Sequence, residues 1–571
     1  MQHVPYRFQI VLVASILLWT FAGCSDKDSG EDSSIRDSNG TESPDSESGT
    51  ATHSDTDTDT DTDSDTDADS DTDTDTDTDS ATGAGDADGD SDGDTGTGPI
   101  GDTDADTDGD TDSDSDPDIP VSDVLTPFDA NRSDLVYHGS WDTQYGKAPE
   151  IVVAVSAVAD NELDVLAQDY SDTSPNFVLL HIKKKSSGFQ VTEALTDIPK
   201  LDRIMGLSVD ADGNRYYATG VDENANITPD YPGLNEYRSD IVRLVKLDAN
   251  GDVVYNLDLD VARHEFKSDA DKLINPMTFS SARLLYGGGT LLLVHARNGD
   301  PDPKIANERH QFITQTFVDA QSGEITDVSS IWCSHSFDQR LLFDGSEIIE
   351  NYLGDAYPRQ VMFARGGKDH AIMDIKGPVG ENRTWTQLGN MVVIDEDAQW
   401  GYLSLNATEN NSDTADDVNG SMNLALTRIH RTTNETDSGW DSQTVGGNTN
   451  YMRWLTDFED GSNRHAQRPK LIGVGDNLYI ALFEQWLVED AGSGWNRYKG
   501  TFEGVYAMAI DSDGNVVQPA TRVTSEHHLH RGDDAFAFQG MAAWMTGDGI
   551  QQALYVHTVD TSLNYKMYTI D

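Results

Sequence analysis

The sequence predicts an all-β protein that follows a long acidic segment. Two observations predict this fold class. After Val121, no long stretch repeats its apolar residues with the 3.6-residue period of a helix, and short apolar segments alternate with turns rich in Gly, Asp and Asn. In addition, an element of two apolar strands joined by a turn recurs along this part of the chain. We therefore divide the chain into residues 1–23, 24–121 and 122–571.

The first residues have the order of a secretory signal peptide. Arg7 supplies a positive charge, and residues 8–21 form an apolar run that is short for a membrane span. The run ends in Phe21-Ala22-Gly23-Cys24, and a polar segment follows. These residues predict a signal peptide over residues 1–23.

The end of this segment resembles the lipobox of bacterial lipoproteins. Ala22 and Gly23 fit that pattern, whereas Phe21 stands where the family usually has Leu. The resemblance implies cleavage before Cys24 and attachment of acyl chains such as palmitate to its thiol. In Gram-negative lipoproteins an Asp after the cysteine favours the inner membrane, so Ser25 implies the outer membrane, on either of its sides. The alternative is an ordinary signal peptide with a chance cysteine.

Residues 24–121 form a low-complexity acidic segment. Between positions 25 and 120 there are 35 Asp and Glu against Lys27 and Arg36, a net charge of −33 out of −64 for the chain. Residues 54–80 alternate Asp with Thr, Ser or Ala, so a strand here would have two polar faces and nothing to bury. We expect a disordered, self-repelling tether that spans more than about 50–60 Å and holds a folded domain away from a membrane.

Calcium binding is the alternative interpretation of this tether. Two windows, beginning at Asp88 and at Asp104, resemble the opening of an EF-hand loop. Such a loop needs a bidentate Glu at its twelfth position, where these windows have Pro99 and Ser115. The tether is therefore expected to bind calcium only weakly and diffusely.

The cysteine count limits what can stabilise the folded part. Cys24 and Cys333 are the two cysteines of the chain, so a lipidated Cys24 leaves one thiol and no internal disulfide. The folded part must depend on its core, and it is long enough to form one or to divide into several domains.

A two-strand element occurs seven times in residues 122–571. Asp-Gly, Asn-Gly and Ser-Gly pairs at many of the turns favour tight hairpins because they allow positive φ angles. The copies begin at Glu150 (EIVVAVSAVADNELDVLAQ), Met205 (MGLSVDADGNRYYATGV), Ser281 (SARLLYGGGTLLLVHA), Gln339 (QRLLFDGSEIIENYL), Gly389 (GNMVVIDEDAQWGYLSL), Arg468 (RPKLIGVGDNLYIALFE) and Gly540 (GMAAWMTGDGIQQALYVHT).

Most copies are followed by a second hairpin, for example from Asp240, Gln311 and Gly504. Two hairpins per unit make a four-stranded antiparallel sheet, and a radial ring of such sheets is a β-propeller. We predict seven four-stranded blades, with six or eight as alternatives. The last unit shows only three strands, so we expect a segment over residues 133–143 to complete its blade and close the ring. Tandem β-sandwiches are the alternative.

Residues 209–220, VDADGNRYYATG, resemble the repeats of bacterial NHL-type and SBBP-type propellers. The resemblance covers one or two hairpins and depends on turn chemistry. It implies the propeller fold and no particular function.

Searches for catalytic motifs give no enzyme class. The sequence contains no Gly-x-Ser-x-Gly elbow, Walker A loop, His-Glu-x-x-His motif or the Asp-box repeats of sialidase-like propellers. Whether the protein is an enzyme stays open, and the motifs favour a binding protein.

Polar residues gather just before the predicted innermost strands, where propeller side chains face the central channel. Such a mouth would suit an anionic or hydroxylated ligand. We expect four of these side chains, His335, Arg340, His465 and Arg468, to surround one funnel. The alternative is that these groups hydrate the channel or bond to neighbouring loops. The candidate ligand-binding residues are His335, Asp338, Arg340, Arg203, His465, Arg468 and Gln539.

The segment SEHHLHRGDD, residues 525–534, is a candidate metal site. In an extended chain His528 and His530 would point the same way, with Asp533 near enough to join them. The alternative is an exposed polar loop between blades.

Three functions follow from these features. The first is a binding or interaction module displayed on the outer membrane or cell surface, with a glycan, an anionic ligand or an envelope protein as partner. The second is a carbohydrate-active or other hydrolytic enzyme, and the third is a structural envelope protein. Nucleic acid is not expected as a partner, because the part after the tether has 67 acidic against 35 basic residues.

Overall fold

The chain divides into two units, Met1–Thr107 and Asp108–Asp571. The computed structural model describes residues of the second unit, namely 118–128 and most of 151–570. Within 151–570 it leaves out residues 172–175, 202, 221–240, 261–273, 276–281, 300–309, 333–337, 355–359, 376–385, 396, 410–420, 446–447, 460–461 and 491–497. The predicted signal peptide, Cys24, most of the tether, the strand over residues 133–143 and His335 therefore lie outside the described residues. No helix in the described part is long and apolar enough to span a membrane.

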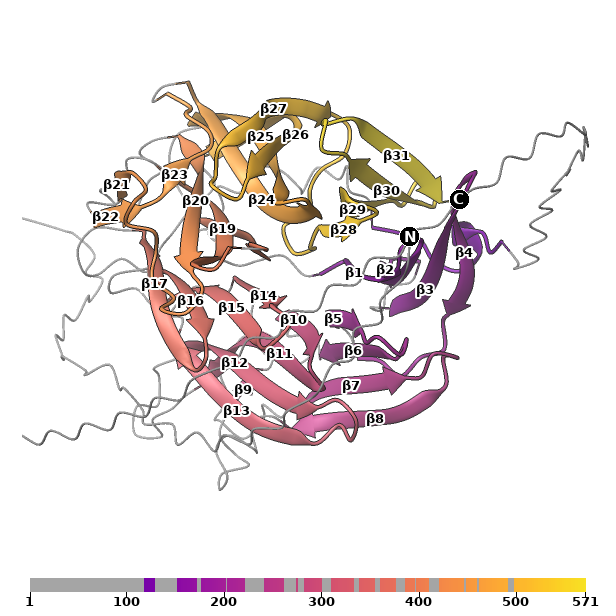
Figure 1. Cartoon of the computed structure of the whole chain (residues 1–571). Coiled ribbons are helices and arrows are strands. Elements are labelled where there is room, and N and C mark those ends of the chain that lie inside the picture. Colours follow the sequence, from indigo (N-terminus) through magenta and orange to yellow (C-terminus); the bar gives the residue numbers. More distant parts are fainter. Residues whose placement is uncertain are drawn as a thin grey trace, which may run out of the picture. The chain divides into compact units, whose positions relative to one another are not determined.

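The described residues form a seven-bladed β-propeller, as predicted. Each blade is an antiparallel sheet of four strands around a common centre (Figure 1). The first four blades are blade 1 with β1 (Val153–Ala159), β2 (Glu162–Asp169), β3 (Asn176–Lys185) and β4 (Gly188–Leu195); blade 2 with β5 (Arg203–Val209), β6 (Arg215–Gly220), β7 (Ile241–Leu247) and β8 (Val253–Asp260); blade 3 with β10 (Ala282–Gly287), β11 (Thr290–Gly299), β12 (His310–Asp319) and β13 (Ile325–Trp332); and blade 4 with β14 (Gln339–Phe343), β15 (Ile348–Leu353), β16 (Gln360–Arg365) and β17 (Lys368–Asp374).

The remaining blades continue in the same order along the chain. They are blade 5 with β18 (Gln387–Val393), β19 (Trp400–Glu409), β20 (Met422–His430) and β23 (Arg453–Trp454); blade 6 with β24 (Arg464–Gly475), β25 (Leu478–Asp490), β26 (Tyr498–Asp511) and β27 (Val516–Thr524); and blade 7 with β28 (Phe536–Phe538), β29 (Met541–Asp548), β30 (Ala553–Val559) and β31 (Tyr565–Ile570). Outside this pattern, β9 (Ile274–Asn275) pairs with β11, and β21 (Ser442–Val445) pairs with β22 (Asn448–Tyr451).

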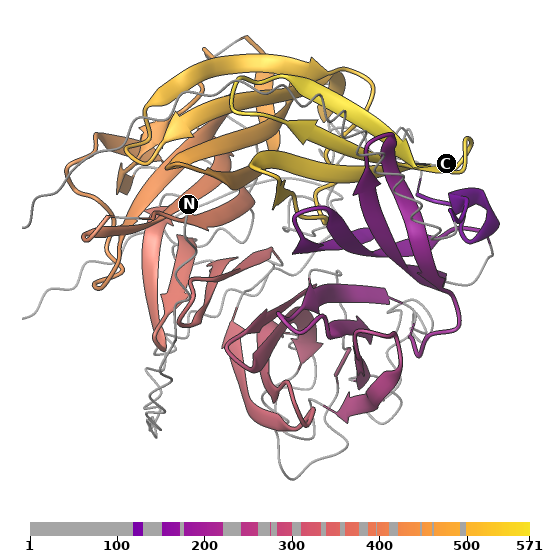
Figure 2. The ribbon, with the colours of Figure 1, turned by 45° about the vertical axis from the view of Figure 1, so that its right-hand side comes forward.

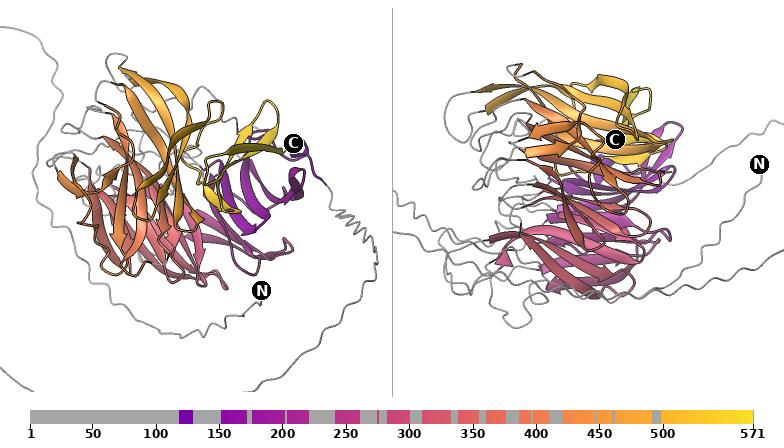
Figure 3. Two further views of the ribbon diagram at one scale, coloured as in Figure 1. Left: turned by 45° about the horizontal axis from the view of Figure 1, so that its top comes forward. Right: turned by 60° about the vertical axis from the view of Figure 1, so that its left-hand side comes forward.

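The first strand of every blade lines the centre of the ring. The first strands contact one another in succession, β1 with β5, then β10, β14, β18, β24 and β28, and β28 contacts β1 again. Figure 3 shows the same ring of sheets from two other sides. The N-terminal ends of these seven strands therefore meet at one end of the central channel.

The strands of blade 7 show that the predicted ring closure was wrong. The segment over residues 133–143 was expected to supply a missing strand, but all four strands of blade 7 come from residues 536–570. The missing strand was β28, whose three residues are too few to show a period of two. The recurring element that begins at Gly540 thus forms strands two and three of its blade, whereas the other six form strands one and two.

One apolar cluster fills each of the seven interfaces between neighbouring blades. The alternating strands supply these clusters because both faces of each sheet pack on a neighbouring sheet. The cluster between blades 7 and 1 also contains side chains from residues 118–128, which precede the first blade. Figure 2 shows blade 7, in yellow, next to blade 1, in indigo.

We call residues 118–128 the clasp segment. It includes a short 3₁₀ turn, Val121–Asp123, and it buries Val121, Leu125 and Phe128 in the interface cluster. Its backbone bonds to blade 1, where Ile119 donates to the Val191 carbonyl oxygen at 3.0 Å. On the other side it lies against β29 of blade 7, where a β-carbon on Gly547 would come within 2.4 Å of the Phe128 carbonyl oxygen.

Candidate functional site

The connection from blade 6 to blade 7 enters the centre of the propeller. We call residues 525–535, between β27 and β28, the hub segment. Its members Leu529, Arg531 and Asp533 are 1, 2 and 8% exposed, so the segment is not the exposed loop that its polarity suggests. Such a burial of charge requires partners, and those partners come from five other blades.

Blade 4 supplies a buried ion-pair network. Asp338, directly before β14, is fully buried and pairs with two guanidinium groups, Arg340 at 2.5 Å and Arg531 of the hub segment at 3.2 Å. Arg340 also donates to backbone carbonyl oxygens of Gln339 at 2.7 Å and of Leu388, in blade 5, at 3.2 Å. This network ties the first strands of blades 4 and 5 to the hub segment.

Asp534 takes a second pair of guanidinium groups. Its carboxylate lies 3.0 Å from Nε of Arg283, in β10 of blade 3, and 3.7 Å from Nε of Arg340. The amide of Asn390, in blade 5, lies 3.5 Å away. The Asp534 side chain is 41% exposed, the largest fraction among the described charged residues of this cluster. Asp534 is thus the carboxylate that the cluster presents to solvent in the channel.

Blade 6 holds the hub segment through β24. Lys470 is 2% exposed, and its ammonium donates to the backbone carbonyl oxygens of Arg531, at 3.2 Å, and of Asp533. Arg468 forms 2.9 Å bonds to both carboxylate oxygens of Glu484 and also donates to the Leu529 carbonyl oxygen at 3.3 Å.

The backbone of β24 is irregular at this point. Arg468 has a φ of 53°, in the left-handed region, at a register shift between Gln467 and Lys470. Its N–H donates to Oε1 of Gln387 in blade 5 at 2.7 Å. A bulge of this kind redirects side chains and is common next to functional sites.

Blade 1 receives the last contact of the hub segment. Oδ1 of Asp533 accepts hydrogen bonds from the backbone N–H groups of Val152 at 2.9 Å and Val153 at 3.2 Å. The same oxygen lies 3.2 Å from Nδ1 of His530, whose ring packs on Phe128 of the clasp segment at 5.3 Å. The hub and clasp segments are therefore in contact.

The electrostatics of the cluster keep its carboxylates charged. Burial alone would raise the pKa of Asp338, but Arg340, Arg531 and Arg283 outweigh burial and lower it below its ordinary value. Burial also opposes ionisation of Asp534, and Arg283, Arg340 and Lys470 again lower its pKa. These groups therefore act as anionic hydrogen-bond acceptors at neutral pH rather than as general acids.

Three of the seven predicted ligand-binding residues meet at the hub segment. Asp338 and Arg340 contact Arg531, and Arg468 contacts Leu529. Arg340 and Arg468 thus both lie against the hub segment, but they are 1 and 2% exposed and engaged in internal ion pairs. Buried and paired, they are not available as the free cations that an anionic ligand would need.

The remaining predicted residues lie elsewhere or differ in character. His465 precedes Arg468 on β24, and burial lowers its pKa to about 4, so its ring is neutral. Arg203 begins β5 and is half-buried. Gln539 is exposed in the turn after β28, the opposite end of a first strand, and it accepts a 2.7 Å bond from Lys184. Its placement at the mouth was wrong because β29 was taken for the innermost strand.

The three predicted metal ligands do not converge. His530 and Asp533 face each other, but the ring of His528 packs on Phe502 at 3.9 Å and faces Glu484 of blade 6. Among the described residues, no group of three or more His, Cys, Asp or Glu side chains is arranged to hold a metal ion.

Sequence reasoning missed two cations of the cluster, Arg283 in blade 3 and Lys470 in blade 6. Arg283 and Arg340 are each the second residue of a first strand, and each is followed by two leucines. Lys470, in the first strand of blade 6, is followed by Leu471 and Ile472. A search for a basic residue before two apolar residues in the recurring element would have found Arg283 and Lys470.

No family model and no curated protein sequence matches the chain. Solved structures with a similar fold include an acylaminoacyl peptidase of Pyrococcus horikoshii, with 8% identity and a TM-score of 0.35 over 78% of this chain and 52% of the peptidase. Another is the β-propeller domain of the Trilobed protease from Pyrococcus furiosus, described as having an open velcro topology, with 9% identity and a TM-score of 0.32 over 74% of this chain and 95% of that domain.

A third is a Trypanosoma rangeli sialidase, with 11% identity and a TM-score of 0.31 over 62% of this chain and 54% of the sialidase. This chain therefore spans about half the length of the peptidase and of the sialidase. Similarity at this level carries no activity to this chain, and the propeller is established by its own strand order.

Proposed function

We propose that this protein is a lipid-anchored binding module of the outer membrane or cell surface of a Gram-negative bacterium. Acyl chains on Cys24 would anchor it, and residues 24–121 would act as an acidic spacer that carries the propeller. Support comes from the lipobox-like residues before Cys24, the charge of the spacer and the closed, internally paired propeller.

The ligand class that the channel supports best is a hydroxylated one, such as a glycan. The observation that carries this proposal is the Asp534 carboxylate, 41% exposed and held between Arg283 and Arg340. A fixed carboxylate accepts hydrogen bonds from neighbouring hydroxyl groups without needing a charged ligand. An anionic ligand is less well supported, because Asp338, Asp534 and Glu484 already pair with the guanidinium groups.

Binding by the full-length protein tests this proposal. A panel of neutral and acidic oligosaccharides identifies a ligand, and calorimetry then compares Asp534→Asn with the wild type. We expect affinity to fall about 10- to 100-fold, since hydrogen bonds to a charged group contribute about 1.5–3 kcal/mol. The matched control is Asp513→Asn, whose carboxylate is 67% exposed and pairs with Arg428 in blade 5. Equal affinity in the wild type and Asp534→Asn would refute the proposed site.

Lipid attachment is tested separately in cells. Metabolic labelling with a fatty-acid analogue should mark the wild type and leave Cys24→Ser unlabelled and released from the membrane fraction. Equal labelling of the two proteins would show that Cys24 is not the anchor, whatever the propeller binds.

A further inference from the structure

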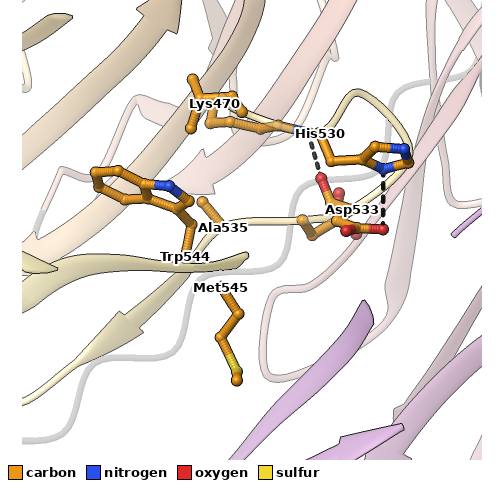
Figure 4. A pocket seen from close by; sticks show the side chains of 8 residues that line it. Lys470, His530, Asp533, Ala535, Trp544 and Met545 are labelled. Carbon is orange, nitrogen blue, oxygen red and sulfur yellow. Dashed lines mark hydrogen bonds and ion pairs between the residues drawn. The ribbon is translucent and has the colours of Figure 1, made fainter. Parts of the chain in front are cut away.

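A small pocket lies between the hub segment and blades 6 and 7. It is lined by Lys470, Leu529, His530, Asp533, Asp534, Ala535, Trp544 and Met545 (Figure 4). Its volume of about 10 Å³ is room for a single body of about the size of a water molecule. Asp534, the carboxylate proposed to meet a ligand, also lines this pocket.

Two hydrogen-bond donors of this pocket have capacity left. The indole N–H of Trp544 is buried and has no hydrogen-bond partner, although the residue is only 3% exposed. In Figure 4 the indole nitrogen lies on the side of the ring that faces the pocket. The Lys470 ammonium has three N–H groups and uses two of them on carbonyl oxygens of the hub segment. Buried donors are rarely left unpaired in proteins, so an acceptor is expected here.

The charge around Lys470 favours an anion as that acceptor. Four cations of the cluster, Arg283, Arg340, Arg531 and Lys470, face three carboxylates, Asp338, Asp533 and Asp534. When Lys470 is protonated, the cluster therefore carries one more positive than negative charge, while Arg468 and Glu484 neutralise each other nearby. Two guanidinium nitrogens of Arg531, Nε and Nη1, are also buried without a hydrogen-bond partner.

The two carboxylates that line the pocket are directed at other groups. Oδ1 of Asp533 faces the backbone N–H groups of Val152 and Val153 and the ring of His530. The carboxylate of Asp534 faces Arg283 and Arg340. An anion at Lys470 and Trp544 would thus meet two donors, while these carboxylate oxygens are engaged with other groups.

We propose that this pocket binds one small monovalent anion of the size of chloride, held between the Lys470 ammonium and the Trp544 indole N–H. The anion supplies the missing negative charge and the missing acceptor together. It thereby strengthens the junction between the hub segment and blades 6 and 7.

Binding of the anion is linked to pH. Without it, burial, and then Arg340, lower the pKa of Lys470 to about 7; Asp534 and Asp533 act in the opposite direction, and Arg283 adds to the lowering. An anion beside the ammonium favours its charged form. Affinity for the anion is therefore greater below pH 7, where the amine is protonated, than above it.

Thermal unfolding of the full-length protein tests the proposal. Melting temperatures are compared in sodium chloride and in sodium gluconate at equal ionic strength, since gluconate is too large for the pocket. We expect the melting temperature to rise with chloride alone, and to rise more at pH 6 than at pH 8.5. Identical melting curves in the two salts would mean that the pocket holds water or nothing, and would overturn the proposal.

Variants locate the effect. Trp544→Phe keeps the aromatic packing and removes the N–H. It should raise the chloride concentration needed for a given increase in melting temperature at least tenfold. Lys470→Met should abolish it. The matched control is Trp440→Phe, because the Trp440 indole N–H is also buried and unpartnered but lies between blades 5 and 6, away from the pocket. If Trp544→Phe folds and responds to chloride like the wild type and Trp440→Phe, the assigned site is wrong.

Discussion

The hub segment and the junction between blades 7 and 1 both hold the ring together, but by opposite means. At the hub, charged side chains from blades 3, 4 and 6 and backbone groups of blade 1 meet a single connection. At the junction, apolar side chains of two blades and of the clasp segment pack into one cluster. Propellers commonly close by sharing strands, and the described strands of this one keep to their own blades.

The difference follows from position relative to the channel. Between blades, two broad sheet faces meet, and alternating apolar residues can cover them without directional contacts. At the channel, seven strand ends converge, and their polar backbone groups need specific partners. Ion pairs that span several blades meet that need, and they also fix which blades are neighbours. The comparison predicts that single substitutions are more costly at the hub than at the junction.

The largest effect is expected for Arg340→Met, which removes a cation from the buried network. Asp338 would keep its charge in a fully buried site with one guanidinium instead of two. The free energy of unfolding, measured by urea denaturation, should fall by about 3–5 kcal/mol. The control is Arg464→Met at the start of β24, where the side chain is 49% exposed and pairs with Glu503, and the change should stay below about 0.5 kcal/mol. A loss below about 1 kcal/mol for Arg340→Met would show that the hub is dispensable.

Glu350 tests whether the cation partner, rather than burial, sets the ionisation of a buried carboxyl. It lies on β15 and is 2% exposed, nearly as buried as Asp338, and Gln315 donates to one of its oxygens. Burial raises the pKa of Glu350 to about 8, with a further contribution from Asp369. The guanidinium groups, in contrast, keep the pKa of Asp338 below its ordinary value. The carboxyl is therefore protonated in the native state at neutral pH.

Replacing Glu350 with Gln should remove a pH dependence of stability. Since the native pKa lies above the ordinary value of 4.5, the contribution of Glu350 is complete below pH 4.5 and is lost as the pH rises to about 8. Relative to Glu350→Gln, the wild type should lose about 3 kcal/mol of unfolding free energy between pH 5 and pH 8. Parallel stability profiles for the two proteins would mean that Glu350 is ionised in the fold.

The contrast between local strand patterns and contacts between distant residues explains what the sequence could predict. Hairpin turns and alternating strands are local signals, and they gave the number of blades and six of the first strands. The strand β28 was missed because three residues carry no period. Arg340 and Arg468 could be placed at one mouth because they hold similar positions in their repeats. The burial of Arg531 could not be predicted, since its partners lie 61 to 193 residues away and nothing within SEHHLHRGDD marks it as an interior segment.

A smaller effect is expected where the clasp segment lies on blade 7. A β-carbon added to Gly547 would lie 2.4 Å from the Phe128 carbonyl oxygen and 2.7 Å from the Pro127 side chain. Gly547→Ala should therefore displace the clasp segment and lower the unfolding free energy by about 1–3 kcal/mol. Limited proteolysis should then cut near residues 118–128 earlier than in the wild type. Gly473→Ala is the control, because its new β-carbon would lie at an ordinary 3.7 Å from Tyr479; the same cleavage pattern in both variants would contradict a closing role for the clasp.

The smallest effect concerns Lys184, a cation at the apolar junction between blades 7 and 1. Lys184 of β3 lies 5.4–5.8 Å from the ring centroids of Phe189, Phe538 and Tyr568, and it donates to Gln539 of blade 7. Lys184→Met keeps most of the apolar side chain and removes the charge, so any loss reports electrostatic attraction to the rings and the hydrogen bond. We expect Lys184→Met to lower the unfolding free energy, measured by urea denaturation, by about 0.5–1.5 kcal/mol. Lys184→Arg keeps a cation over the rings and should retain most of the stability. If Lys184→Met is as stable as the wild type, the junction between blades 7 and 1 is held by packing alone.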